Sequence, residues 1–219
     1  MLCVSAQGRQ ILRVANMQRT IFETPVVNTF MRAVSRLLLR ATGWRTEGMT
    51  PAEIAAYPKY VLIAAPHTSN WDAPITLMVC FQLHLKVYWM AKASLFAWPM
   101  GALSRWLGGI AIDRSASNNT VQHTIAAFAA RERLAVIVAP EGTRGKVTHW
   151  KTGFYHIAQG AGVPIALAYL DYARKAGGIG RMFVTTGDIG ADMAEIQAFY
   201  SGITGKNAHQ FDANTVKRG

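Results

Sequence analysis

The stretch Tyr60-Val-Leu-Ile-Ala-Ala-Pro66, followed at once by His67-Thr-Ser-Asn-Trp-Asp72, decides the fold of this chain. Its first part is apolar without alternation, which is typical of a strand that helices cover on both faces. The small polar residues after it mark the exit of that strand and can cap a helix that starts near Asp72. The stretch therefore predicts a buried strand, a loop that carries His67, and a helix.

The loop places an imidazole and a carboxylate five residues apart, at His67 and Asp72. Histidine can take a proton near neutral pH, and a carboxylate on its second nitrogen fixes the tautomer and stabilises the imidazolium. If the helix begins by Asp72, the carboxylate can fold back on His67. The pair would then be a general base with its orienter. The alternative is a loop histidine beside a helix-capping aspartate.

Outward from this stretch, apolar strands alternate with helical segments. Strands are predicted at 60–65, 87–90, 110–112, 134–139, 164–170 and 181–186, and helices at 74–85, 118–131, 153–160 and 191–199. This alternation predicts a single α/β domain with a central, largely parallel or mixed sheet flanked by helices. We expect this domain to span residues 46–204, after a basic segment at 1–45 and before a polar tail at 205–219.

Composition limits the classes of function. The 219 residues carry a net charge of +11, with a pI near 10.1, which calls for an anionic partner. The basic residues form no single run and match no nucleic-acid motif, so a membrane surface or a phosphorylated substrate is favoured over nucleic acid. Two cysteines form no disulfide framework, and the histidines have no metal-ligand spacing. We therefore expect neither a metal nor a resident cofactor.

The first 45 residues hold seven arginines against one acid, Glu23, and predict an amphipathic helix at 27–41. Its apolar positions are Val27, Phe30, Met31, Val34, Leu37 and Leu38, with Arg32, Arg36 and Arg40 on the opposite face. Such a helix can lie in the headgroup layer of a membrane, or it can pack on the domain while its arginines face water. We expect no signal peptide and no transmembrane helix, and hence a peripheral position at the cytoplasmic face of the cell membrane.

Three further blocks follow the His-x4-Asp pair: Gly108-Gly-Ile-Ala-Ile-Asp-Arg114, Ala139-Pro-Glu-Gly-Thr-Arg144 and Val163-Pro-Ile-Ala-Leu-Ala168. In order and approximate spacing, the four blocks together resemble the glycerolipid acyltransferase family, of the lysophosphatidic-acid acyltransferase type. The resemblance covers roughly residues 44 to 190. A His-x4-Asp pair alone arises often by chance, whereas Pro-Glu-Gly-Thr-Arg downstream of it makes the combination specific.

The resemblance implies which residues bind the acceptor. The family assigns the second and third blocks to the phosphate of the acceptor, and this role falls here on Arg114, Glu141, Gly142, Thr143 and Arg144. A glycine lets backbone amides approach a substrate, and guanidinium forks suit phosphate oxygens. Glu141 cannot attract a phosphate itself and would orient an arginine or contact the glycerol hydroxyl. Lys151 is a further phosphate or CoA candidate, with a solvated lysine as the alternative.

The implied enzyme is an O-acyltransferase that moves a fatty acyl group from acyl-CoA or acyl-ACP to a lysophospholipid, lysophosphatidic acid by default. His67 would act as general base, oriented by Asp72. No Gly-x-Ser-x-Gly elbow occurs, and this favours direct transfer over an acyl-enzyme on Ser69. Another lysolipid or glycolipid acceptor, hydrolysis of the acyl thioester, and a non-enzymatic basic protein remain as alternatives.

Overall fold

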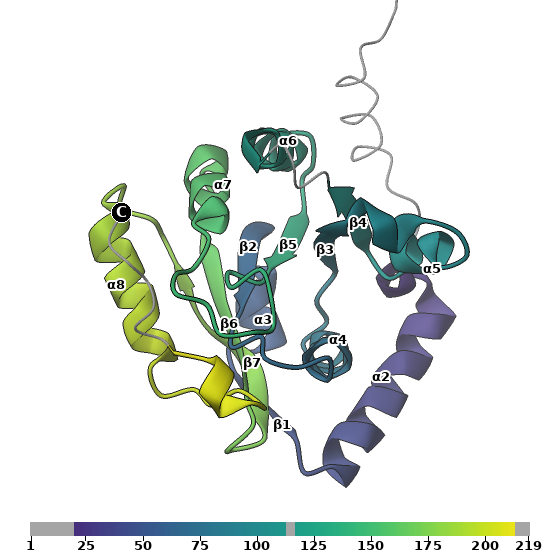
Figure 1. Cartoon of the computed structure of the whole chain (residues 1–219). Helices are drawn as coiled ribbons and strands as arrows, with labels where there is room; N and C mark the ends of the chain where they lie inside the picture. Colours follow the sequence, from purple (N-terminus) through teal and green to yellow (C-terminus); the bar gives the residue numbers. More distant parts are fainter. Residues whose placement is uncertain (1–19, 113–116, 213–219) are drawn as a thin grey trace, which may run out of the picture.

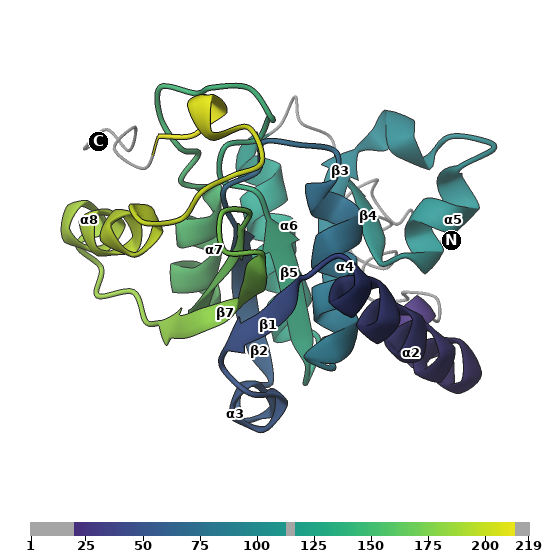
Figure 2. The ribbon, with the colours of Figure 1, turned by 90° about the horizontal axis from the view of Figure 1, so that it is seen from below.

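The structure is a computed structural model that describes residues 20–112 and 117–212. Those residues form a seven-stranded sheet with helices on both faces (Figures 1 and 2). The strands are β1 (Arg45–Gly48), β2 (Lys59–Ala64), β3 (Val87–Lys92), β4 (Gly109–Ile112), β5 (Leu134–Val138), β6 (Ile165–Asp171) and β7 (Ala176–Phe183). Their order across the sheet is β1-β7-β6-β2-β5-β3-β4. Every neighbouring pair is parallel except β6 and β7, so the expected α/β class with a mixed sheet is confirmed.

Longer helices and short helical turns join these strands. The α-helices are α2 (Pro25–Ala41), α3 (Pro51–Ala55), α4 (Asp72–Gln82), α5 (Gly101–Trp106), α6 (Ser117–Ala129), α7 (Gly153–Ala161) and α8 (Ile189–Tyr200). Single 3-10 turns are η1 (Ile21–Glu23), η2 (Ala93–Phe96) and η3 (Ala208–Gln210). Among the described residues, no helix combines the length and the apolar character that crossing a bilayer requires.

Two hydrophobic cores lie on opposite faces of the sheet. On β2, Val61 and Ile63 point into a core with α6, α7 and α8, while Tyr60 and Leu62 point into a core with α2 and α4. Alternate residues of a strand face opposite sides of a sheet, so a strand covered on both sides must be apolar throughout. This explains why residues 60–66 form an uninterrupted apolar run.

Besides the 3-10 turns, one strand and two short helices were not predicted, and one further strand begins earlier than expected. The missed elements are β1, α3 and α5, and the strand expected at 181–186 is β7, which begins at Ala176. The start of β7 is Ala-Gly-Gly, which gives no apolar signal. At Gly178 a Cβ atom would collide with the carbonyl oxygen of Glu47 on β1, so glycine is needed where these two strands meet.

Helix α2 packs on the domain through part of the expected apolar face: Val27 and Met31 pack against the core shared with α4, whereas Phe30 and Leu37 do not. Ser35 and Leu39 are buried against the core shared with α4, whereas Val26, Phe30 and Leu37 are 82, 64 and 68% exposed. Since an α-helix turns about 100° per residue, these three form one stripe that faces away from the domain. The helix therefore carries an apolar stripe outward as well as a contact face inward.

The sheet brings three loops together at one edge. Strands β6, β2 and β5 are adjacent and parallel, so their carboxyl ends lie side by side (Figure 1). The loop after β2 carries His67, the loop after β5 carries Glu141, and the turn after β6 carries Tyr172. Binding sites of open α/β sheets lie outside the carboxyl ends of the strands. A binding or catalytic site is therefore expected at this edge of the sheet.

Candidate functional site

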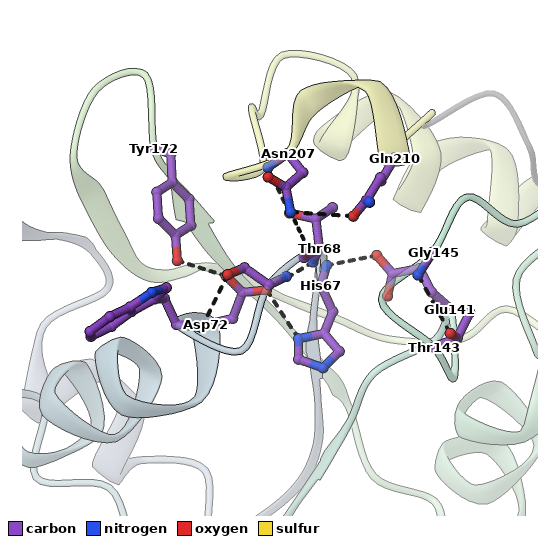
Figure 3. A network of polar contacts seen from close by, with 11 residues as sticks. His67, Thr68, Asp72, Glu141, Thr143, Gly145, Tyr172, Asn207 and Gln210 are labelled. Carbon is purple, nitrogen blue, oxygen red and sulfur yellow. Dashed lines mark hydrogen bonds and ion pairs between the residues drawn. The ribbon is translucent and has the colours of Figure 1, made fainter.

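The imidazole of His67 and the carboxylate of Asp72 form the expected pair. Asp72 is the first residue of α4, and the distance from its Oδ2 to Nδ1 of His67 is 3.1 Å (Figure 3). The Asp72 side chain is 5% exposed and that of His67 is 24% exposed, so the carboxylate is buried while the imidazole reaches the surface. With Nδ1 turned to Asp72, Nε2 is the nitrogen that can face a substrate.

Asp72 is held by hydrogen bonds to both of its oxygens. The main-chain N–H groups of Thr68 and Ser69 donate to Oδ2, each at 2.8 Å, and the hydroxyl of Tyr172 donates to Oδ1 at 2.7 Å. Burial alone would raise the pKa of Asp72. The hydrogen bonds from His67, Tyr172 and the Ser69 backbone outweigh this, so its pKa lies below the usual range. Asp72 is therefore an anion fixed in one orientation.

Glu141 joins the loop after β5 to the loop after β2. Its Oε1 accepts a hydrogen bond of 2.9 Å from the main-chain N–H of His67, and the residue is only 5% exposed (Figure 3). Oε2 is buried and has no hydrogen-bond partner among the described residues. Burial raises the pKa of this carboxyl group, more than the hydrogen bond from His67 lowers it. Its contact is thus with the backbone that carries the imidazole.

The turn after Glu141 is exposed and basic. Gly142 adopts a φ of +66°, and a Cβ atom there would lie 3.1 Å from Nζ and Cε of Lys151. Lys151 therefore lies across the turn, and its main-chain N–H donates to the carbonyl of Pro140 at 2.9 Å. Thr143 and Arg144 are both exposed, and the Thr143 hydroxyl accepts from the N–H of Gly145 at 3.4 Å. The structure thus gathers two cations, Lys151 and Arg144, on one loop.

An open pocket of about 480 Å³ is formed in part by Thr68 and Ser69, which directly follow His67 in the chain. It is lined by Thr68, Ser69, Asn70, Trp71, Arg144, Gly145, Asn207 and Gln210. The lining comes from the loop after β2, the turn after Glu141 and the segment after α8. Polar groups and one guanidinium dominate this lining, so the pocket suits a polar, anionic group of a ligand.

The segment after α8 folds over the site instead of beginning the expected polar tail. Asn207 pairs with Thr68 twice: its main-chain N–H donates to the Thr68 hydroxyl at 3.2 Å, and its Nδ2 donates to the Thr68 carbonyl at 2.7 Å (Figure 3). With its amide nitrogen facing inward, Gln210 donates to the carbonyls of Thr68 and Arg144, at 3.0 and 2.8 Å. Nζ of Lys206 lies 5.1 Å above the ring of Trp71.

Most of the residues predicted from the sequence meet at this edge. His67 contacts both Asp72 and Glu141, and the loop after Glu141 carries Gly142, Thr143, Arg144 and Lys151. Arg114 lies outside the described residues. Ser69 uses its hydroxyl to accept the N–H of Trp71 at 3.1 Å, in keeping with a capping role.

Sequence reasoning missed the contributions of Tyr172, Asn207 and Gln210. Tyr172 stands two residues after the strand predicted at 164–170, and the rule that sites lie beyond the carboxyl ends of parallel strands points to it once β6 is known to neighbour β2. No comparable signal marks Asn207 and Gln210, because they follow a helix and lie in a polar stretch.

The chain is similar to known acyltransferases. The family model Acyltransferase matches residues 49–169. The 1-acyl-sn-glycerol-3-phosphate acyltransferases of Salmonella typhimurium and Salmonella typhi are each 33% identical to this chain over 131 residues, which are 56% of this chain and 51% of the relative. The chain therefore spans about half the length of the curated relatives it matches.

One solved structure also resembles the chain. It is the crystal structure of the 1-acyl-sn-glycerophosphate (LPA) acyltransferase PlsC from Thermotoga maritima, with 16% sequence identity and a TM-score of 0.48 over 82% of this chain and 78% of that one. The family match itself covers more than half of the chain and includes His67, Asp72 and the Glu141 turn. The chain belongs to the Acyltransferase family.

Proposed function

We propose that this chain transfers a fatty acyl group from an acyl thioester, acyl-CoA or acyl-ACP, to the free hydroxyl of a lysophospholipid, with lysophosphatidic acid as the first candidate and phosphatidic acid as its product. The observation that carries the proposal is the 3.1 Å pair of His67 and Asp72, whose loop continues into a pocket that Arg144 also lines. The names of the relatives support the same substrate class.

In this reaction His67 acts as general base. Its Nε2 takes the proton of the acceptor hydroxyl as that oxygen attacks the carbonyl carbon of the thioester. The new C–O bond forms and the C–S bond breaks, and His67 returns the proton to the departing sulfur. Asp72 stabilises the imidazolium that exists between the two proton transfers. The acceptor hydroxyl takes the place of an enzyme nucleophile, so no acyl-enzyme is formed.

Arg144 and Lys151 bind the phosphate of the acceptor in this proposal. A guanidinium presents paired N–H donors that match phosphate oxygens, and the exposed turn at Gly142 leaves Arg144 open to a ligand. Thr143 adds a hydroxyl on the same turn, and Arg114 is a further phosphate ligand by its place in the family motif. The acyl thioester is a co-substrate, and the steps above require no metal and no prosthetic group.

An anionic membrane surface is the partner that we propose for the side of the molecule formed by α2 and α5, at the cytoplasmic face of the cell membrane. The apolar stripe of α2 is exposed there, and Trp98, which precedes α5, is 92% exposed. No aspartate or glutamate occurs at positions 24–46 or 73–112, whereas arginines such as Arg36 and Arg40 do. Apolar groups flanked by cations suit the interface of an anionic bilayer.

The test is thiol release from palmitoyl-CoA by the purified protein, with and without lysophosphatidic acid, followed by analysis of the lipid product. Acceptor-dependent release with formation of phosphatidic acid is the expected result. Release that needs no acceptor would identify a thioesterase instead. No release with any lysophospholipid, from either acyl-CoA or acyl-ACP, would overturn the proposal.

A further inference from the structure

Tyr172 makes a contact with the site that no motif assigns to it. Tyr172 is the residue that follows β6. Strand β6 pairs with β2, and β5 pairs with β2 on its other side. Its hydroxyl donates to Oδ1 of Asp72 at 2.7 Å, on the opposite side of the carboxylate from the Oδ2 that faces His67 (Figure 3). Tyr172 does not contact His67 directly, so any influence on the imidazole passes through Asp72.

The phenol ring is itself fixed from two sides. Its edge packs against Trp44, with ring centroids 4.9 Å apart and planes at 89°. The main-chain N–H of Tyr172 donates to the carbonyl of Thr204 at 2.9 Å, which holds the residue on the segment after α8. A side chain held by packing and by a backbone hydrogen bond can orient its neighbour at little further entropic cost.

The hydroxyl is also kept in the form that donates. Burial, together with the nearby Asp72 carboxylate, raises the pKa of Tyr172, so the phenol retains its proton throughout the neutral range. On Asp72, Oδ2 accepts from two N–H groups and faces His67, while Oδ1 accepts from Tyr172. Without the phenol, that side of the carboxylate would lose this donor.

We propose that Tyr172 is a positioning residue for acyl transfer: its hydroxyl fixes the orientation of the Asp72 carboxylate, and thereby the ring of His67. This inference rests on the proposed function for its kinetic consequence. It adds a residue from the β6–β7 turn to a pair that the motif confines to one loop and the start of α4. It assigns Tyr172 no contact with either substrate.

Tyr172→Phe tests the proposal because it removes only the hydroxyl and keeps the ring against Trp44. Tyr169→Phe is the matched control, since Tyr169 lies three residues earlier, on β6, and its hydroxyl donates to Glu47 at 3.5 Å instead of to Asp72. Both variants are compared with the parent at a temperature where circular dichroism shows all three folded. The readouts are kcat, the KM for each substrate, and the ring-nitrogen NMR signals of His67.

The expected result for Tyr172→Phe is a kcat lower by about tenfold, with each KM within about twofold of the parent, since a hydrogen bond to a charged group is lost and no substrate contact is. The His67 ring signals should also shift, while Tyr169→Phe leaves kcat and those signals unchanged. A higher KM with unchanged kcat, or unchanged His67 signals, would overturn the positioning role. If the parent itself transfers no acyl group, the proposed function fails, but the His67 signals still decide whether Tyr172 orients the pair.

Discussion

The main-chain N–H of His67 donates a hydrogen bond of 2.9 Å to Oε1 of Glu141, and this contact joins two motifs that lie 74 residues apart in the sequence. It also changes the role expected of Glu141. The carboxylate does not need to touch the acceptor to matter for catalysis, because it holds the backbone that carries the imidazole.

Glu141→Ala should lower the free energy of unfolding by about 1–3 kcal/mol, because the buried N–H of His67 loses its acceptor. Glu141→Gln keeps an acceptor oxygen and should be at least as stable as the parent at neutral pH. Burial raises the pKa of Glu141, so its contribution to stability is present below about 4.5 and is lost as pH rises through the folded pKa. Urea unfolding of the three proteins across this range measures the effect, and equal losses in both variants would contradict it.

His67→Ala should reduce kcat by about 10²–10⁴-fold while the protein still folds, because the histidine is assigned to proton transfer and its side chain reaches the surface. His156→Ala is a matched control, since His156 is exposed on α7 and takes no part in the site. The measurement is phosphatidic acid formed per unit time under saturating substrates. Normal turnover by the His67 variant would remove the general-base assignment.

Asp72→Asn should show where the ionised carboxylate contributes to stability. The pKa of Asp72 is lowered in the folded protein, so its stabilising contribution is fully present above about 3.8 and is lost as pH falls below that value through the folded pKa. The parent should therefore be the more stable protein at neutral pH, and the difference should shrink in acid. Unfolding free energies from urea titrations between pH 3 and 7 test this, and a difference that is constant across that range would contradict it.

The sequence predicted the fold where strands are buried on both faces. Residues 60–64 of β2, 134–138 of β5 and 165–170 of β6 are apolar because helices cover these strands on each side, and such runs are readable without a structure. Strand β1 is Arg-Thr-Glu-Gly at the edge of the sheet, and an edge strand that faces water needs no apolar pattern. Helix α3 did carry a local signal, the capping box formed by Thr50 and Glu53, which a search for apolar periodicity passes over.

The site was predictable as far as it is local in sequence. His67 and Asp72 lie in one loop and at the start of the next helix, so their spacing alone suggests that they meet. Tyr172 and Asn207 reach the same loop from distant elements, and which strand neighbours β2 is set by the packing of the whole sheet. The hydrogen bond of Glu141 was missed for a different reason. Its donor is a backbone N–H, which nearly every residue has, so the residue type at position 67 does not predict it.

Arg144→Gln should raise the KM for lysophosphatidic acid by about tenfold while the KM for acyl-CoA stays within about twofold, because the guanidinium is assigned to the acceptor phosphate. Arg133→Gln is the matched control: Arg133 is also exposed but precedes β5, at the opposite end of that strand from the site. Steady-state kinetics with each substrate varied in turn make the comparison. Equal increases in both KM values would argue against a phosphate-specific role.

The exposed stripe of α2 leads to a prediction about membrane binding. Phe30 and Leu37 are 64 and 68% exposed, so the double change Phe30→Ser and Leu37→Ser should leave the melting temperature nearly unchanged. The same change should weaken binding to vesicles that contain anionic lipid by about tenfold or more, because two apolar side chains no longer enter the interface.

Val184→Ser is the control, since Val184 is 72% exposed but lies after β7, away from α2. Sedimentation with vesicles of anionic or of purely zwitterionic lipid separates the apolar contribution from that of Arg36 and Arg40. Unchanged binding by the double variant would mean that α2 serves only to cover the core beside α4.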